Sequence, residues 1–544
     1  MSEEQQRHQQ QEQREHLVRL LRACVSPDER ARKEAESTVT SSGAHFGFGA
    51  LLCDTAFGMA EENEAIPNDI RQLAALLLKK YVRERWQIGE QNFVEGEPMT
   101  SNEEKMSIKA QICSGLRMKD SKMRTACALV VAQIATHDWP EEWEGLLGEL
   151  LIPIREKRDV NHVNGALRCM SMLCGDLEEQ QLPKLVPELF PDLCGLLQTA
   201  DDGLNGIDRE QMFMVKCRAL DVTSGCYSNL GMIGDDQIRL QIKEAATPFL
   251  ESNFVAFGNI FEFRSDVFET VSGCTLTLSA LKAMQGTVQY FGKEITGGQV
   301  VSEQTFGGCV ERFFHVFEKA ANRYVQCRGV ELNALDDCED DMGDKISNAA
   351  IVTQCMELAM TMIENTKIAK GCVQPRIKSL VSIAVATSLT TDDQLETWED
   401  DVNQFVADEE DDYQSVRATS AIFLDNISAK FPKLFYGVLA EVVAERFEQS
   451  FEEQKNKDEN WWRSKEAALL AVGSVSDSLV EHDKEARSKN ASPAFDCNAF
   501  LNEIIRTEFS ATPTSNPFLK GRALWAASRL AAAASAEGPN TILD

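Results

Sequence analysis

The sequence predicts an all-α protein built as a right-handed α-solenoid of roughly ten to twelve helix pairs. Two observations lead to this fold class. Apolar residues recur with the period of helices that bury one face, and no convincing run of alternating apolar and polar residues indicates a strand. A short pattern typical of a helix start also returns several times along the chain, as expected for stacked repeats.

The helical period is clearest in residues 70–86, IRQLAALLLKKYVRERW, where apolar residues follow the i, i+3, i+4, i+7 spacing of one buried helix face. Similar apolar stripes occur at 123–136, 142–154, 163–174, 209–231, 268–290, 346–366, 374–388, 415–429, 433–448, 462–479 and 518–533. Each of these segments is predicted to be a helix that packs against its neighbours in the chain.

The recurring helix-start pattern has an Asp or Asn, an apolar residue followed by Arg, and then an Ala-rich apolar run. Copies begin at Asn68, Asp120 and Asp411, with looser copies at Arg463 and Gly521. The acid or amide is expected to cap the first backbone N–H groups, and small Ala residues allow helices to approach closely. We expect the Arg to reach a carboxylate of a neighbouring repeat. The spacing fits HEAT-type repeats of about 40–47 residues with loop insertions.

Composition limits the class of partner. Hydrophobic residues make up 43% of the 544 residues, so global disorder is excluded, and the net charge is −31. Such a charge disfavours direct binding of nucleic acid and anionic membranes, and it attracts basic proteins.

The sequence also indicates the compartment. Sixteen dispersed cysteines without any C-x-x-C indicate a reducing compartment. The Gln- and Glu-rich start is no targeting peptide, and no apolar run is long enough for membrane insertion, which predicts a soluble cytosolic protein.

Two acidic segments are candidates for binding a basic partner. Residues 391–412 contain eleven acidic residues and no basic one, and residues 336–344 form a second cluster. In the first segment apolar residues are interleaved with the acids, which favours a binding loop over a solvated one; for the second, a solvated loop is favoured. Neither has the spacing of a calcium loop. The candidate residues of the first segment are Trp398, Glu399, Asp400, Asp401, Phe405, Asp408, Glu409, Glu410, Asp411 and Asp412.

Sequence motifs for catalysis are absent. The chain has no H-E-x-x-H, no G-x-S-x-G and no phosphate-binding glycine motif with the required spacing. Its seven histidines are dispersed without metal-ligand spacing. The sequence therefore predicts a binding protein with no enzymatic activity, no cofactor and no metal.

Several segments resemble the importin-β (karyopherin) family of nuclear transport receptors. Residues 70–86, with 31–39 upstream, resemble the family's N-terminal Ran-binding domain, and HDWPEEWEGLLGELL at 137–151 resembles its DWP-x-x-W segment. Further segments in the same order resemble one branch of this family, and they lie at 165–177, 398–417, 461–475 and 495–529. The resemblance extends over nearly the whole chain.

This resemblance implies a nuclear import receptor for basic cargo such as core histones and ribosomal proteins, released by the GTP-bound form of the small GTPase Ran (Ran-GTP). It also implies contacts with nucleoporins and shuttling between cytoplasm and nucleus through the nuclear envelope. The candidate Ran-binding residues are Arg71, Lys79, Lys80, Arg83 and Trp86. The acidic segment is expected to contact cargo or Ran. Two alternatives stay open: a HEAT-repeat scaffold of an enzyme complex, such as a phosphatase subunit, and an exportin.

The expected organisation follows from these segments. We expect a flexible Gln/Glu-rich N-terminus, an importin N-terminal Ran-binding region, HEAT repeats, an acidic insertion loop, further HEAT repeats and a tail, at 1–14, 15–150, 151–390, 391–412, 413–534 and 535–544 respectively. Because receptors of this family are about twice as long, the resemblance implies an N-terminal half, and the tail is expected to be a truncation point.

Overall fold

The computed structural model describes residues 3–59, 65–87, 98–176, 179–200, 208–262, 270–330, 338–339, 345–401, 403–404, 415–509 and 516–533. Over these ranges the chain is helical, and an isolated antiparallel bridge joins Glu339 to Lys345. The predicted all-α class is confirmed. The chain divides into two compact units, Met1–Asn253 and Phe254–Asp544.

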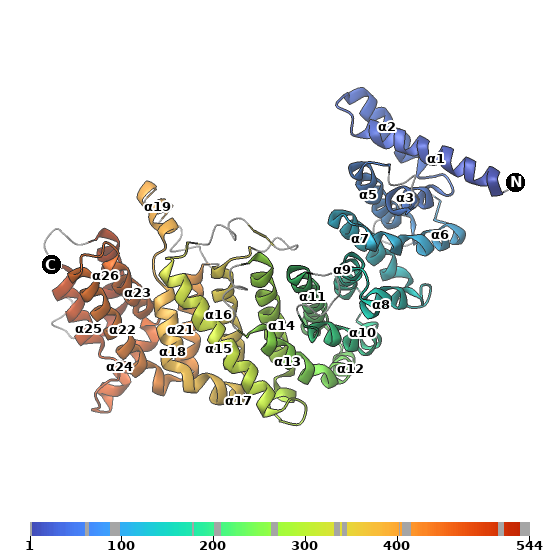
Figure 1. Cartoon of the computed structure of the whole chain (residues 1–544). Helices are drawn as coiled ribbons and strands as arrows, with labels where there is room; N and C mark the ends of the chain where they lie inside the picture. The colour runs from blue at the N-terminus through green and yellow to red at the C-terminus, as the bar shows by residue number, and fades with distance from the viewer. Residues whose placement is uncertain are drawn as a thin grey trace. The chain divides into compact units, whose positions relative to one another are not determined.

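The first unit is a double layer of helices. Its helices are α1 (Glu3–Cys24), α2 (Glu29–Ser42), α3 (Phe48–Phe57), α5 (Asn68–Arg85), α6 (Asn102–Ile112), α7 (Ser121–Asp138), α8 (Leu146–Glu156), α9 (Val160–Asp176), α10 (Leu182–Leu197), α11 (Arg209–Met232) and α12 (Asp236–Ala246). Helices α5, α7, α9 and α11 pack side by side in one layer, and α3, α8 and α10 pair with α5, α9 and α11 in the other (Figure 1). Helix α13 (Leu250–Ile260) crosses from this unit into the next.

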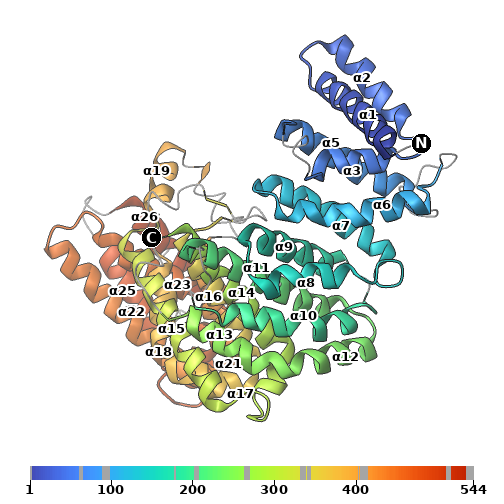
Figure 2. The ribbon, with the colours of Figure 1, turned by 45° about the vertical axis from the view of Figure 1, so that its right-hand side comes forward.

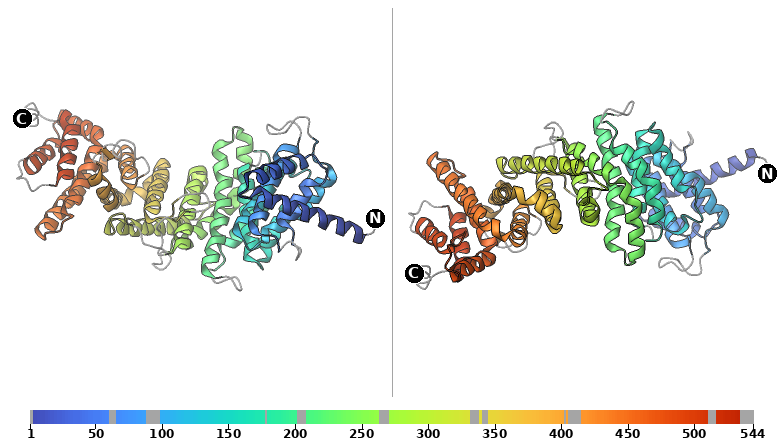
Figure 3. Two further views of the ribbon diagram at one scale, coloured as in Figure 1. Left: turned by 90° about the horizontal axis from the view of Figure 1, so that it is seen from above. Right: turned by 90° about the horizontal axis from the view of Figure 1, so that it is seen from below.

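The second unit repeats this arrangement. Its helices are α14 (Val271–Ile295), α15 (Glu303–Gln326), α16 (Asn348–Glu364), α17 (Thr366–Ile368), α18 (Ile377–Thr387), α19 (Asp392–Asp400), α21 (Val416–Lys430), α22 (Pro432–Lys455), α23 (Trp461–Ser474), α24 (Ser476–Ser488), α25 (Cys497–Ile504) and α26 (Pro517–Leu530). Helices α14, α16, α21, α23 and α26 form one layer, and α15, α18 and α22 cover it. Within each unit the colours follow chain order from helix to helix (Figure 3), so each pair packs on its sequence neighbours.

Of the three full copies of the helix-start pattern, one caps its helix at the predicted residue. In the other two the capping residue lies elsewhere. Asp120 accepts hydrogen bonds from the backbone N–H groups of Lys122 and Met123 and caps α7, as expected. Asn68 is instead the first residue of α5 itself, and its side chain donates to Asp120. Asp411 lies outside the described residues, and Ser415 caps α21.

Two segments that we expected to be loops contain helices. Helix α1 begins at Glu3, because Gln, Glu and Arg favour helices and because Leu17 and Leu21 anchor its second half in the core. Helix α19 begins within the acidic segment, where Thr391 and Gln394 form a reciprocal capping box. The boundary expected at residue 150 falls inside α8.

Candidate functional site

The repeated arginines form a buried ionic network in the second unit. Arg417 of α21 donates from Nη1 to Glu466 Oε2 of α23 at 2.9 Å, and Arg522 of α26 donates from Nε to Glu466 Oε1 at 2.8 Å. The Glu466 side chain is only 2% exposed. Burial would raise the pKa of its carboxyl, but the two guanidinium groups lower that pKa to about 2. The expectation that the repeated Arg reaches a carboxylate of a neighbouring repeat is confirmed here.

In the first unit two of the repeated arginines donate to backbone carbonyl groups. Arg71 donates to the carbonyl oxygens of Ala56 and Gly58, both at 3.0 Å, at the end of α3. Arg124 donates to the carbonyl oxygen of Met118 at 2.7 Å. The last carbonyl groups before a chain reversal have no partner within their own helix, so a guanidinium there satisfies the backbone.

The predicted Ran-binding residues on α5 separate into two groups. Lys80 and Arg83 are exposed and Lys79 is half-buried on the outward face of the helix, beside Leu76, which is 53% exposed. Arg71 lies on the opposite face and is buried. The helical period explains the separation, because residues three and four apart share a face. Trp86, which directly follows the helix, is also fully buried.

A buried hydrogen-bonded junction joins the two segments that resemble the family's N-terminal region. Trp86 donates from Nε1 to Asp138 Oδ1 at 2.9 Å, and Lys109 donates from Nζ to Asp138 Oδ2 at 2.8 Å. Asp138 is 6% exposed, so its charge is compensated by Lys109 within the fold. Sequence reasoning missed this junction. The available signal was an Asp at the start of the DWP segment and an indole at the end of the 70–86 segment.

The acidic segment forms a short helix with two faces. Helix α19 and the residue after it expose five carboxylates, those of Asp393, Glu396, Glu399, Asp400 and Asp401. Figure 2 shows α19 beside α26. Of the remaining candidates, Phe405, Asp408, Glu409, Glu410, Asp411 and Asp412 lie outside the described residues, as do the acids at 340–344.

Trp398 faces the protein itself and not solvent. Its side chain is 2% exposed, and its ring lies 5.9 Å from that of Phe518 on α26. Phe518 in turn stacks on Trp462 of α23 at 6.0 Å, and Leu395 packs against the same hydrophobic cluster. The indole therefore packs inside the fold, whereas we expected it to be an anchor for a partner.

Two arginines hold the first residue of α19. Arg328 donates from Nε to both carboxylate oxygens of Asp392, at 2.9 and 3.0 Å, and Arg463 Nη2 lies 2.6 Å from Asp392 Oδ1. Arg463 also donates from Nη1 to the carbonyl oxygen of Thr390 at 2.7 Å. The chain that leads into the acidic helix is thus held at Thr390 and at Asp392.

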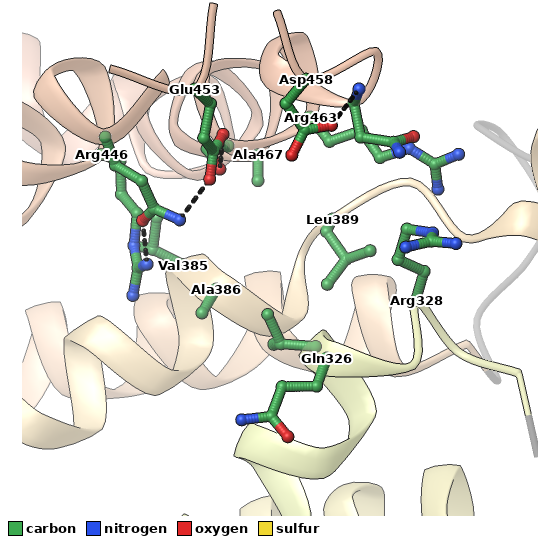
Figure 4. A pocket seen from close by; sticks show the side chains of 14 residues that line it. Gln326, Arg328, Val385, Ala386, Leu389, Arg446, Glu453, Asp458, Arg463 and Ala467 are labelled. Carbon is green, nitrogen blue, oxygen red and sulfur yellow. Dashed lines mark hydrogen bonds between the residues drawn. The ribbon is translucent and has the colours of Figure 1, made fainter. Parts of the chain in front are cut away.

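The same arginines line a pocket of about 290 Å³ between α15, α18, α22 and α23. Figure 4 shows Arg446 at one end and Arg328 toward the other, with Leu389 between them and Glu453 and Asp458 on the opposite wall. Both signs of charge are therefore present around an apolar floor, and the pocket has no arrangement of catalytic groups.

No helix among the described ranges is long and apolar enough to cross a membrane. Within the same part of the chain, no three His, Cys, Asp or Glu side chains gather in a way that could hold a metal ion.

Comparison with known proteins supports the sequence resemblance. A family model described as the importin-beta N-terminal domain matches residues 61–117. The chain is 22% identical to "Importin-9" of Drosophila melanogaster over 518 residues, which cover 94% of this chain and 46% of that protein. It is 27% identical to "Exportin-2" of Pagrus major over 153 residues, 28% of this chain and 14% of that one. The chain thus spans about half the length of the first of these relatives.

Solved structures show the same fold. The exportin Cse1 in its cargo-free, cytoplasmic state matches with a TM-score of 0.59 at 13% identity, covering 96% of this chain and 53% of that one. Kap121p bound to RanGTP matches with a TM-score of 0.56 at 14% identity, covering 98% of this chain and 46% of that one. The predicted stack of HEAT-type helix pairs is confirmed.

Proposed function

We propose that the chain is an importin-β family member and forms the Ran-binding and cargo-binding part of a nuclear import receptor for basic proteins. The observation that carries the proposal is the match of residues 61–117 to the importin-beta N-terminal domain, since this stretch contains α5 and its exposed basic face. The match to importin-9 over most of the chain favours import. Core histones and ribosomal proteins are the proposed cargo, with nucleoporin contacts and shuttling between cytoplasm and nucleus.

In this proposal Ran-GTP binds the outward face of α5. Lys79, Lys80 and Arg83 supply positive charge around the exposed Leu76, a combination that suits a protein interface with an apolar centre and a charged rim. The buried Arg71 and Trp86 act from inside the fold by holding α5 against its neighbours. Kap121p, which has the same fold, has been solved bound to RanGTP, and this supports the proposal that the chain binds Ran-GTP.

Basic cargo is proposed to bind where acidic side chains are exposed. The net charge of −31 attracts positively charged proteins from a distance, and the carboxylates of α19 offer a local contact. The proposed cargo class rests on the family resemblance together with the negative charge.

Export is the second candidate, favoured by the match to Exportin-2. A pull-down with Ran locked in its GTP form separates the candidates. Import predicts that Ran-GTP binds and displaces prebound histone. If Ran-GTP recruits cargo, the chain acts in export, and if it does not bind at all, a HEAT scaffold replaces both proposals.

A further inference from the structure

We propose that Trp398 and Leu395 are positioning residues that dock the acidic helix α19 on the α23–α26 pair and so fix the direction of its carboxylates. The inference rests on the proposed binding of basic cargo. Nothing in the acidic composition of 391–412 predicts such docking, because a segment with this many like charges is expected to stay extended in solvent.

The docking contact is hydrophobic and lies on one face of α19. Leu395 and Trp398 are three residues apart and share one side of the helix. Leu395 packs against a cluster that includes Trp462 and Leu519, and Trp398 contacts Phe518, which packs against the same cluster. Phe518 lies between the Trp398 ring and the Trp462 ring. Trp398 is 98% buried when α19 is docked. Docking therefore removes much more apolar surface from water than a solvated form of the same segment would.

The start of α19 is fixed independently of this hydrophobic contact. Asp392 is held by Arg328 and Arg463, and its backbone N–H donates to the carbonyl oxygen of Arg328 at 3.2 Å. The capping box of Thr391 and Gln394 then begins the helix. With one end and one face held, a helix as short as α19 keeps a single orientation, although an isolated helix of this length is unstable in water.

The exposed acids lie away from the docking face. Asp393, Glu396 and Asp400 follow the i, i+3, i+7 spacing of one helix side, and all three are exposed. A basic partner therefore meets carboxylates whose directions are already set, and it does not have to order the segment on binding. Such preorganisation improves affinity by lowering the entropy cost of association.

The experiment compares five variants of the 544-residue chain for binding of purified core histones and for amide hydrogen exchange of residues 392–400. Trp398→Ala removes the docking side chain, and Phe518→Ala removes its partner on α26 without altering the acidic helix. Trp398→Phe should rescue binding in part. Asp393→Asn/Glu396→Gln/Asp400→Asn removes charge and keeps the docking contact. Phe451→Ala, at a 63% exposed position on α22, is the matched control.

We expect Trp398→Ala and Phe518→Ala each to weaken binding about tenfold. Exchange at 392–400 should become faster, and the salt dependence should be unchanged, because every charge remains. The charge variant should flatten the salt dependence and leave exchange slow.

If the charge variant weakens binding but both docking variants bind and exchange like the wild type, the positioning role is wrong and the proposed cargo site stands. If the charge variant binds histones normally, the proposed cargo site is wrong. If amide hydrogen exchange of residues 392–400 is unchanged in Trp398→Ala, the docking of α19 by this side chain is wrong as well.

Discussion

Glu466 lies between Arg417 and Arg522 and connects three consecutive helices of one layer, α21, α23 and α26. Replacing it by Gln keeps its shape but removes the carboxylate that both buried guanidinium groups share. We expect Glu466→Gln to lower the free energy of unfolding by about 3–5 kcal/mol, measured by urea denaturation. The exposed Glu481→Gln on α24 is the control and should change it by less than about 0.5 kcal/mol. Equal stability of the two variants would show that the network contributes nothing.

The same residue predicts a pH dependence. The pKa of the Glu466 carboxyl is about 2 in the folded chain, against about 4.3 in an unfolded one. A lowered pKa means that the stabilisation is fully present above pH 4.3 or so and is lost as the pH falls toward 2. The stability difference between wild type and Glu466→Gln should therefore shrink over this window, as followed by urea midpoints at successive pH values. A difference that stays constant down to about pH 2 would contradict the ionic origin of the stabilisation.

Among the elements, α5 has one buried face and one exposed face, and the exposed face carries the proposed Ran-GTP contact. Reversing the charges on its outward face with Lys80→Glu/Arg83→Glu should weaken Ran-GTP binding about tenfold or more, because both charges lie on the proposed interface. Circular dichroism should be unchanged, since both side chains are exposed. The control is Arg158→Glu/Lys184→Glu, two exposed positions away from α5. Binding that is reduced equally in both double variants would indicate a general charge effect and not a site on α5.

The elements also show which features of the fold a sequence can predict. The apolar stripe of 70–86 predicted α5 because a long amphipathic helix depends mainly on its own pattern. Helix α19 was missed, since it packs through Trp398 against Phe518, more than a hundred positions along the chain. Its local signals were the Thr391–Gln394 capping box and the spacing of Leu395 and Trp398, which eleven acidic residues in the same segment obscured. The junction of Trp86 with Asp138 was missed for the same reason, because it is a long-range contact.

On the scale of the whole molecule, the charge and composition are read directly from the sequence, and the all-α fold class is predicted from it. None of these properties depends on one particular long-range contact. The net charge of −31 and the recurring helix pattern are distributed along the chain. They can therefore be recognised without knowing the three-dimensional position of any single residue. The division into two units at Asn253 and Phe254 has no comparable signal, because α13 continues through it as a helix.

Net charge and local contact affect different steps of cargo binding. Neutralising the five exposed carboxylates at 393–401 leaves most of the −31 charge in place, so the long-range attraction that steers a basic protein should persist. We therefore expect the association rate of a core histone to fall by less than about threefold, while its dissociation rate rises about tenfold. Stopped-flow binding at several salt concentrations separates the two rates. A large fall in the association rate with unchanged dissociation would show that these carboxylates act only through the overall field, and the contact proposed for α19 would then be wrong.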